Sequence, residues 1–305
     1  MSLILSSAPH IRAKDNTQRL MLNVVISLLP CVAAGLYYFG WKAALVLAVS
    51  VISAVAAECL WQTLAHKKVR VYDLSAVVTG LLLGLIVPPS APWWMVMIGS
   101  FFAIILVKQL FGGIGDNFLN PALAARAVLL ASWPALMTSG YAVGKLDAVT
   151  GPTPLLAGNA SMMDLLVGNV TGAIGETCKI AILIGFVYLL VTGTIRWEIP
   201  VFTVASACLL GWILGTDPLT TVLTGGLLFG AVYMATDYVT SPMTFPARVV
   251  YAIGAGVIIV LIRKYGSYPE GVTYGILLMN IAAPLLDRAM PQRIYGHAKA
   301  KKEAK

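Results

Sequence analysis

Long apolar stretches separated by short polar segments run through almost the whole chain. About 20 apolar residues in a helix cross the hydrocarbon core of a bilayer. By that measure the sequence predicts ten membrane-spanning helices, at residues 20–39, 42–65, 73–88, 92–111, 119–134, 175–193, 198–215, 219–235, 246–264 and 270–290. The third and fifth of these are short and are interrupted by glycine, proline or polar residues. The pattern therefore predicts an all-α, polytopic membrane protein.

The amino-acid composition agrees with this interpretation. The chain has 305 residues, of which 59% are hydrophobic and only 11% are charged. Soluble domains carry about 25% charged residues, so a soluble protein is excluded. We attribute the net charge of +8 to membrane topology and not to nucleic-acid binding. The first 19 residues hold several charges and no apolar core, so no cleavable signal peptide is expected.

The distribution of lysine and arginine predicts the orientation, because these residues concentrate on the cytoplasmic side of a membrane. Ten spans place both termini on one side. If both termini are cytoplasmic, 15 of the 21 Lys and Arg residues belong to cytoplasmic segments and four belong to extracytoplasmic loops. The remaining two fall within spans. The sequence therefore predicts a plasma-membrane protein with two membrane halves, residues 1–134 and 175–305, and an extracytoplasmic loop, residues 135–174.

A short apolar motif occurs once in each half. Gly80–Gly84 reads Gly-Leu-Leu-Leu-Gly and Gly226–Gly230 reads Gly-Leu-Leu-Phe-Gly. Glycines at four-residue spacing are common in membrane helices, so chance similarity is the alternative. The two copies are five spans apart, and halves with an odd number of spans must be inverted relative to each other. We therefore expect two inverted five-helix repeats, with broken helices that meet near the midplane and build a buried site.

Two segments are too polar and irregular to face lipid. They are residues 112–121 (GGIGDNFLNP) and 235–244 (ATDYVTSPMT), both on the predicted cytoplasmic side. Non-helical backbone at membrane depth persists only where protein buries it or where it lines a cavity. Asn120 before Pro121 is a typical helix start, which offers N–H donors to a ligand. The alternative for each segment is an ordinary tight turn.

Several ionisable side chains fall within or close to the predicted spans. They are Glu58, Asp73, Lys108, Arg126, Asp164, Glu176, Lys179 and Asp217. Such residues are functional candidates, although those near a helix end usually extend to the membrane interface. The predicted spans place Glu58, Lys108, Arg126 and Lys179 where they could reach that interface or a neighbouring protein of a complex. No His/Asp relay is evident, so the sequence assigns no ion path.

The four cysteines all lie inside apolar runs. They are Cys31, Cys59, Cys178 and Cys208, without a C-x-x-C pair or clustered histidines. This pattern predicts buried, inert thiols and no metal or iron–sulfur site made by this chain alone.

The longest polar interval contains the segment Asp147–Leu155, which reads DAVTGPTPL. Thr153 lies between Pro152 and Pro154, and proline fixes its own φ angle and disfavours helix in the residue before it. Gly151 leaves room for a bulky group. The segment therefore presents the Thr153 hydroxyl on a stiff, extended backbone, where it is a good acceptor for covalent modification. The alternative is a proline-rich surface turn.

Together these segments resemble those of a known family. The chain resembles the RnfD component of the Rnf complex, an ion-translocating ferredoxin:NAD oxidoreductase. It is also similar to the related NqrB component of the sodium-translocating NADH:quinone oxidoreductase, and the similarity covers nearly the whole chain. The matching segments are Ser7–Arg12, Gly113–Ala122, Ser132–Pro134, Asp147–Leu155, and Ala235–Asp237 with Ser241–Pro242.

This resemblance implies a cofactor and the residue that carries it. The family attaches FMN through its phosphate to a threonine, as a phosphoester made by a separate flavin transferase outside the cytoplasm. The attachment motif reads Thr150-Gly151-Pro152-Thr153 here, with Pro152 where the family usually has a small residue, and Pro154 follows it. Related proteins also hold a non-covalent riboflavin near the cytoplasmic side, and we expect it at the segments 112–121 and 235–244. The further cofactor-binding candidates are Asn120, Arg126 and Asp237.

The resemblance also implies a function. The chain would be an electron-carrying membrane component in which FMN accepts an electron from a neighbouring flavin, with no catalytic acid, base or nucleophile and no metal of its own. Implied partners are the flavin-bearing RnfG, the membrane proteins RnfA and RnfE, the NAD-side RnfC, the flavin transferase and lipid. Two alternatives remain, an inverted-repeat solute channel or transporter and a cofactor-free membrane anchor. Sequence does not assign the coupling ion, Na⁺ or H⁺.

Overall fold

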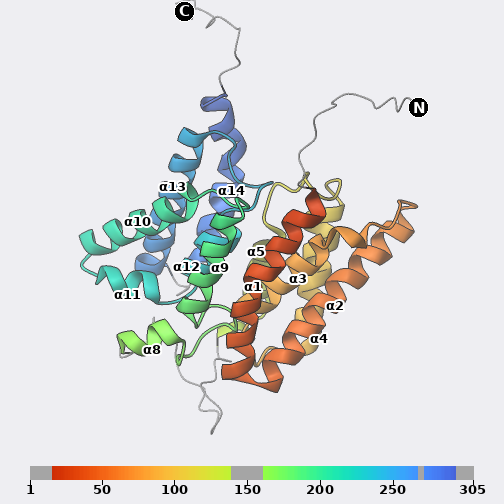
Figure 1. Ribbon diagram of the computed structural model, residues 1–305, viewed down its shortest axis with the longest axis horizontal. Coiled ribbons are helices and arrows are strands. Elements are labelled where there is room, and N and C mark those ends of the chain that lie inside the picture. The colour runs from red at the N-terminus through yellow and green to blue at the C-terminus, as the bar shows by residue number, and fades with distance from the viewer. Residues whose placement is uncertain (1–15, 139–160, 267–270, 293–305) are drawn as a thin grey trace, which may run out of the picture.

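The computed structural model describes residues 16–138, 161–266 and 271–292, and within these ranges the chain is helical without strands (Figure 1). The first half contains α1 (Thr17–Phe39), α2 (Trp41–Leu64), η1 (Val71–Asp73), α3 (Ser75–Ile86), α4 (Trp93–Phe101), η2 (Phe102–Gln109), α5 (Pro121–Ser132) and α6 (Pro134–Thr138). The second half contains α8 (Met162–Val167), α9 (Lys179–Val191), α10 (Glu198–Ile213), α11 (Pro218–Leu223), α12 (Leu227–Phe229), η3 (Gly230–Met234), α13 (Phe245–Tyr265) and α14 (Val272–Ala289). The elements η2 and η3 are π-helical continuations of α4 and α12.

Three of the described helices, α1, α2 and α13, are long and apolar enough to cross a membrane. Five further apolar helices are shorter, and α3 and α5 have 12 residues each. A helix of that length extends only about 18 Å, so neither crosses a bilayer core of about 30 Å by itself. Every predicted span contains a helix, but ten complete crossings remain a prediction.

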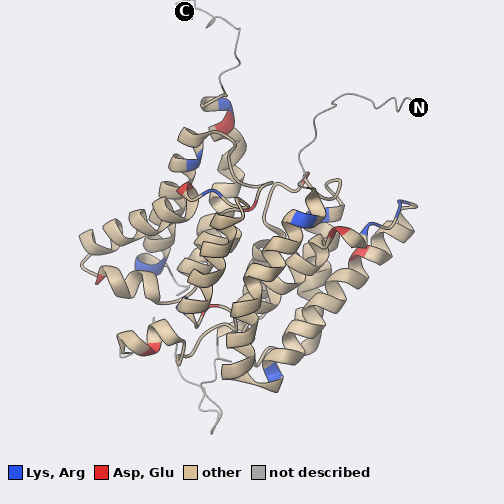
Figure 2. Cartoon of the chain, viewed as in Figure 1, with Lys and Arg blue, Asp and Glu red and all other residues tan. Residues whose placement is uncertain are grey.

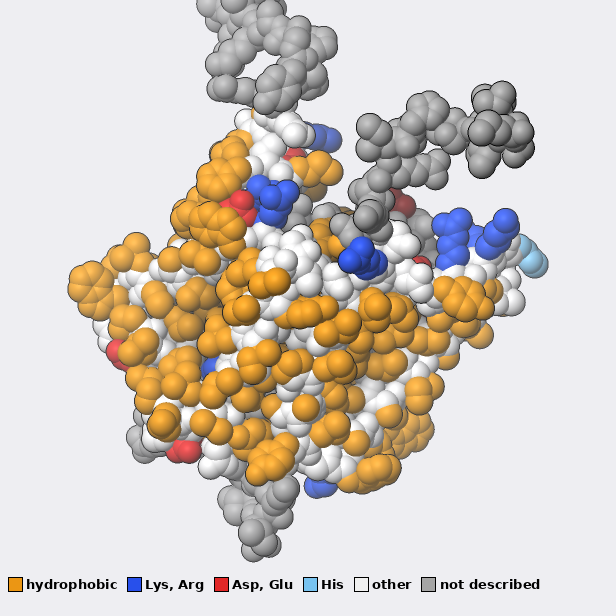
Figure 3. All heavy atoms as spheres, viewed as in Figure 1, with side chains coloured by type: hydrophobic (Ala, Val, Ile, Leu, Met, Phe, Trp, Pro, Cys, Tyr) orange, Lys and Arg blue, Asp and Glu red, His pale blue; other side chains and the backbone are white. Residues whose placement is uncertain are grey.

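The two ends of the described chain lie at the same end of the bundle. In Figure 1, α1 begins and α14 ends at the top, and α8 lies at the bottom. Most charged side chains gather toward the end where α1 begins (Figure 2). Hydrophobic side chains cover the middle of the visible face (Figure 3), as expected for a surface in contact with lipid.

In each half one long helix packs on two neighbouring helices. In the first half α2 packs on both α3 and α4, and in the second half α13 packs on α10 and α14. The halves meet where α1 packs on α9 and where α5 packs on α14. Almost every residue of α3, α12 and η3 is buried. The short elements α3, α12 and η3 therefore lie at the centre of the molecule.

The predicted span 219–235 is a broken helix, as the repeat hypothesis expects of some helices. α11 ends at Leu223 and α12 begins at Leu227, and Gly225 between them has a φ of +61°, which favours glycine. The first copy of the glycine motif lies in the unbroken α3, where a Cβ on Gly80 would lie 2.8 Å from the Cα of Val51. The two copies thus have different local structures, and the inverted repeat remains a prediction.

Candidate functional site

A pocket lies between the two halves of the chain, and we call it the inter-half pocket. Its empty volume is about 780 Å³, counting the open mouth. Apolar residues that line it include Met21, Val24, Val78, Leu82, Leu189, Ile195 and Val232. Polar residues that line it include Ser75, Thr79, Lys108, Asn117, Asn120, Thr236 and Asp237. A mostly apolar pocket with a few polar groups is typical of a small-molecule or cofactor site.

Asn120 holds the two halves together at this pocket. It is the N-cap of α5, and its side-chain oxygen accepts hydrogen bonds from the backbone N–H groups of Ala122 (3.1 Å) and Leu123 (3.2 Å). Pro121 occupies the first turn, where its missing N–H costs nothing. The Asn120 side-chain nitrogen donates to the carbonyl oxygen of Met234, 3.4 Å away at the end of η3. One side chain therefore begins α5 and binds the end of a helix from the other half.

Glycines shape the loop that leads into α5. Gly112, Gly113 and Gly115 have φ angles of +129°, +113° and +99°, which side chains rarely adopt. A Cβ on Gly112 would also lie 2.4 Å from a carboxylate oxygen of Asp116. The loop can therefore fold tightly enough to bring Asn117 and Asn120 to the pocket.

Asp237 follows η3 and lines the same pocket. Its side chain accepts a hydrogen bond of 3.3 Å from the hydroxyl of Thr240. Burial raises the pKa of the Asp237 carboxyl to about 6, because the hydrogen bonds from Val239 and Thr240, which lower it, only partly offset the loss of solvation. The carboxyl group thus titrates close to neutral pH beside the pocket.

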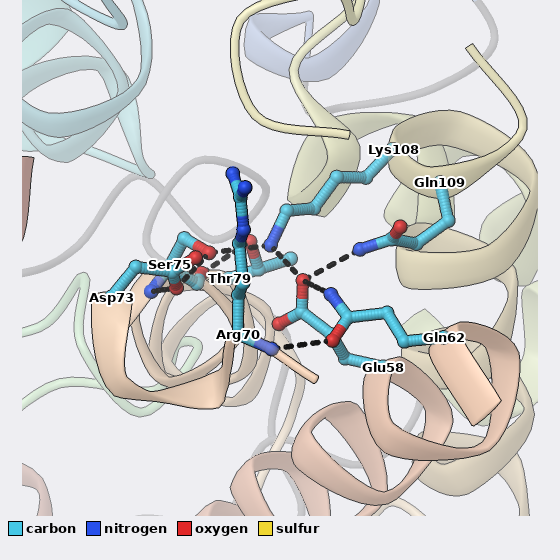
Figure 4. Close-up of polar contacts among 8 residues, drawn as sticks. All are labelled: Glu58, Gln62, Arg70, Asp73, Ser75, Thr79, Lys108 and Gln109. Atoms are coloured by element: carbon cyan, nitrogen blue, oxygen red, sulfur yellow. Dashed lines mark hydrogen bonds and ion pairs between the residues drawn. The ribbon is translucent and has the colours of Figure 1, made fainter. Parts of the chain in front are cut away.

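A buried polar cluster borders the pocket on the side of α2 (Figure 4). Lys108 Nζ lies 2.8 Å from Glu58 Oε1, and the two side chains are 4% and 1% exposed. Gln109 Nε2 donates to the same oxygen at 2.6 Å, and Gln62 Nε2 does so at 3.4 Å. Lys108 also donates to Ser75 Oγ at 2.5 Å, and Ser75 Oγ donates to Asp73 Oδ1 at 2.7 Å.

A second ionic cluster holds the break between α11 and α12. Arg126 Nη1 lies 2.8 Å from Glu176 Oε1, and both side chains are buried. Lys179 Nζ donates to the carbonyl oxygens of Glu176 and Gly225. Arg263 donates to the carbonyl oxygens of Thr221 (2.7 Å) and Thr224 (3.2 Å) at the end of α11. Cationic side chains therefore satisfy the carbonyl groups that the broken helix leaves unpaired.

These two clusters correct the expectation for the ionisable residues. Glu58, Lys108, Arg126 and Lys179 are all at most 4% exposed and have partners within this chain. Each is therefore buried against other residues of this chain and does not extend to the surface of the described part of the molecule. The expectation of buried thiols holds for Cys31, whereas the other three cysteines are half-buried.

The structure brings together only some of the residues that the sequence predicted to bind the cofactor. Asn120 and Asp237 both line the inter-half pocket. Arg126 lies on α5 beyond Asn120, in its ion pair with Glu176, and does not line this pocket. The attachment motif with Thr150, Gly151, Thr153 and Pro154 lies outside the described residues.

Sequence reasoning missed other pocket residues, chiefly Ser75, Thr79, Lys108 and Tyr233. Lys108 had a signal, since a lysine inside an apolar run needs a partner. The partner could not be read from the sequence, because Glu58 is 50 residues away and meets Lys108 only when α2 packs on η2.

The fold and the pocket define a class, namely a polytopic helical membrane protein with a mostly apolar pocket between two halves. Comparison with known proteins then gives the family. The chain belongs to the NQR2, RnfD, RnfE family, whose model matches residues 4–296. The resemblance inferred from the sequence motifs is thereby confirmed.

Curated relatives match along almost their whole length. The D subunit of the Na(+)-translocating ferredoxin:NAD(+) oxidoreductase complex of Acetobacterium woodii is 49% identical, over 100% of this chain and 99% of the relative. The D subunit of the proton-translocating ferredoxin:NAD(+) oxidoreductase complex of Clostridium ljungdahlii is 39% identical, over 93% of each chain. The D subunit of the ion-translocating oxidoreductase complex of Alcanivorax borkumensis is 37% identical, over 97% of this chain and 98% of the relative.

Proposed function

We propose that this chain is the RnfD-type membrane component of an ion-translocating ferredoxin:NAD oxidoreductase and that it relays electrons through FMN esterified to Thr153. The observation that carries the proposal is the match of family and relatives along the whole chain, 49% identical in one case. The Thr150–Thr153 motif adds to it, since a solute channel has no reason to carry a flavin-attachment sequence. The relatives are named for different ions, so the proposal leaves Na⁺ and H⁺ open.

We further propose that the inter-half pocket holds a second, non-covalent flavin. The pocket fits the chemistry of such a group, because apolar walls from α1, α3 and α9 suit an aromatic ring, and polar groups of Asn117, Asn120 and Thr236 suit its hydrogen-bonding edge. A bound flavin would supply the electron-transfer chemistry, and the chain supplies position and hydrogen bonds. Asp237 and Lys108 both line this pocket. Two ionisable side chains would therefore lie close enough to the flavin ring to influence its charge.

The topology proposed with this function has both termini in the cytoplasm and Thr153 outside it, in the plasma membrane. It is supported by the distribution of Lys and Arg along the sequence. It is also supported by the fold, because the start of α1 and the end of α14 lie at the same end of the bundle. The transferase and the flavin-bearing RnfG would then meet Thr153 outside the cytoplasm, and RnfA, RnfE and RnfC would complete the complex.

In-gel flavin fluorescence after denaturing electrophoresis tests covalent attachment. The wild type, Thr153→Ala, Thr153→Ser and the control Thr138→Ala are each expressed with a flavin transferase. We expect fluorescent bands for the wild type and Thr138→Ala, none for Thr153→Ala, and a weaker band for Thr153→Ser, which keeps a hydroxyl. Thr138 is a suitable control because it is exposed and, among the residues that the structure describes, its hydroxyl bonds the local carbonyl of Pro134.

A dark wild-type band would contradict this proposal, provided that the same transferase labels another substrate in parallel. The cofactor-free anchor or the solute channel would then become the better account. Uptake of small solutes into vesicles containing this chain alone would separate those two, because only the channel permits it.

A further inference from the structure

A second cavity lies on the other side of the Glu58–Lys108 pair, and we call it the polar cavity. Its empty volume is about 1640 Å³, counting the open mouth. Residues 16–18 line it at the start of α1, and so do Lys67 and Lys68 after α2. Its inner wall includes Glu58, Gln62, Asp73 and Gln109. The cavity therefore connects the end of the bundle where α1 begins with a carboxylate that is 1% exposed.

A continuous chain of hydrogen bonds joins the polar cavity to the inter-half pocket. Glu58 and Asp73 line the polar cavity, and Ser75 and Lys108 line the inter-half pocket. Lys108 Nζ donates to Glu58 Oε1 (2.8 Å) and to Ser75 Oγ (2.5 Å), and Ser75 Oγ donates to Asp73 Oδ1 (2.7 Å). An ammonium group has three N–H donors, so Lys108 keeps one for a group in the inter-half pocket.

The carboxylate at the outer end of this chain is only half satisfied. Glu58 Oε1 accepts three hydrogen bonds, from Lys108, Gln109 and Gln62. Glu58 Oε2 is buried and has no partner among the residues that the structure describes. In Figure 4 this oxygen points away from Lys108 and Gln109, toward Arg70 and Asp73 of the polar cavity. An unpaired buried carboxylate oxygen is costly, and a purely structural ion pair would gain from satisfying it.

We propose that Glu58 and Lys108 form a proton relay that carries protons from the polar cavity to a redox-active group held in the inter-half pocket. The relay rests on the proposed function, which places a non-covalent flavin in that pocket. It makes Lys108 the proton donor that touches the bound group and Glu58 the group that reloads Lys108. No ion path follows from the sequence, because the relay exists only when α2, α3 and η2 pack together.

One proton accompanies each electron through the relay. When a redox carrier of a neighbouring protein supplies one electron to the bound group, Lys108 breaks one N–H bond and gives that proton to it, which leaves a neutral amine. Glu58 takes a proton at Oε2 from water in the polar cavity. After rotation of the carboxyl group, Glu58 passes this proton to Lys108 Nζ and returns to the carboxylate. One electron and one proton thus reach the pocket, and the charge of the pair is restored.

Other charged groups around the relay set its working conditions. Lys67, Lys68 and Arg70 line the polar cavity together with Asp73, and Asp237 faces the inter-half pocket. The three basic residues repel cations from the cavity mouth, which favours delivery of a proton through water over occupation by a metal cation.

The chain offers a matched control for the structural role of the pair. Glu198 on α10 is 5% exposed, pairs with Arg248 at 3.4 Å and also has an Oε2 without a partner among the described residues. It lines neither of the two cavities. Glu198→Gln therefore reproduces the loss of a buried ion pair without touching the relay.

The experiment uses the assembled complex with this chain as wild type, Glu58→Gln, Glu58→Ala or Glu198→Gln. Non-covalent flavin content is measured first, and then flavin bleaching and proton uptake are followed by rapid mixing with reductant and a pH-indicator dye. We expect Glu58→Gln to slow proton uptake about 10-fold or more, in line with the contribution of a positioned proton donor. Glu198→Gln should leave it unchanged, and formate should restore the rate in Glu58→Ala because the polar cavity admits a small acid.

A second measurement needs no cofactor. Glu58→Cys and Glu198→Cys are treated with a small water-soluble thiol reagent, and peptide mass spectrometry locates the label. We expect label at position 58, next to the polar cavity, and none at position 198. Lack of label at position 58 would contradict access from this cavity.

The outcomes separate the relay from the function on which it rests. If the wild-type complex contains no non-covalent flavin, the occupant of the inter-half pocket is wrong and the relay falls with it. If flavin is present and Glu58→Gln matches Glu198→Gln in proton uptake, the relay alone is wrong and the pair is structural. Slowed uptake in Glu58→Gln, restored in Glu58→Ala by formate, supports the relay.

Discussion

The side-chain nitrogen of Asn120 lies 3.4 Å from the carbonyl oxygen of Met234, so the cap of α5 in the first half binds the end of η3 in the second. The same side chain caps α5, and the inter-half pocket lies directly beside it. Asn120 therefore contributes to the start of α5, to the contact between the halves and to the wall of the pocket.

Replacing Asn120 by alanine should destabilise the chain and weaken the pocket. Loss of an asparagine cap costs about 1–2 kcal/mol of stability, and the bond to Met234 is lost with it. Ser161→Ala is the control, since it removes the cap of the short, peripheral α8. Thermal unfolding in detergent should show the larger loss for Asn120→Ala, together with reduced non-covalent flavin. Equal loss in both variants would refute a special role for Asn120.

The contact between α3 and α2 depends on the absence of a side chain at position 80. A Cβ on Gly80 would lie 2.8 Å from Val51 Cα and 2.9 Å from Ser50 O, and backbone atoms cannot yield. We expect Gly80→Ala to destabilise the chain by about 1–3 kcal/mol. At Gly84 the nearest atom is the end of the Leu47 side chain at 3.0 Å, which can move. Gly84→Ala should therefore be close to neutral in chemical denaturation, and the reverse order would be inconsistent with this packing.

Stability should depend on pH through Asp237. Its folded-state pKa is raised from 3.8 to about 6, so the folded state binds the proton more tightly than the unfolded state. The contribution of this group to stability is fully present below pH 3.8 and is lost as the pH rises to about 6. The difference in unfolding free energy between wild type and Asp237→Asn should change over this pH window and be constant above it. A difference that does not vary with pH would contradict the raised pKa.

The Arg126–Glu176 pair should behave as a buried ion pair. Glu176→Gln leaves Arg126 without its carboxylate, which costs about 3–5 kcal/mol when one partner of a buried pair is removed. Arg126→Gln combined with Glu176→Gln should be less destabilising than the sum of the single changes. A double-mutant cycle by urea unfolding measures this coupling. Additive single effects would mean that the two side chains do not interact in the folded chain.

Helix positions could be read from the sequence because the apolar runs are long. The predicted span 42–65 is α2, Trp41–Leu64, and the span 20–39 falls within α1, Thr17–Phe39. The sequence also predicted that Asn120 and Asp237 lie close together, because the segments 112–121 and 235–244 were both expected on the cytoplasmic side. Both residues line the inter-half pocket. The break at Gly225 could not be seen as such, because the carbonyl groups it exposes are satisfied by Lys179 and Arg263 from other helices.

The partners in the buried ion pairs could not be predicted from the sequence for a related reason. Glu58 pairs with Lys108 and Arg126 with Glu176, each across 50 residues. A single sequence shows that a charge in an apolar run needs a partner, but the partner depends on which helices pack together. Arg126 was predicted to bind the cofactor, yet it lies on α5 in an ion pair with Glu176 and does not line the pocket.

Acid fractionation of the purified chain tests the central claim of a two-flavin protein most directly. Denaturing acid leaves covalent flavin in the protein pellet and releases non-covalent flavin to the supernatant, where chromatography identifies it. We predict FMN in the wild-type pellet and riboflavin in the supernatant, with only the pellet flavin lost in Thr153→Ala and only the supernatant flavin reduced in Asn120→Ala. A wild-type chain from an intact, transferase-active host with flavin in neither fraction would contradict the account.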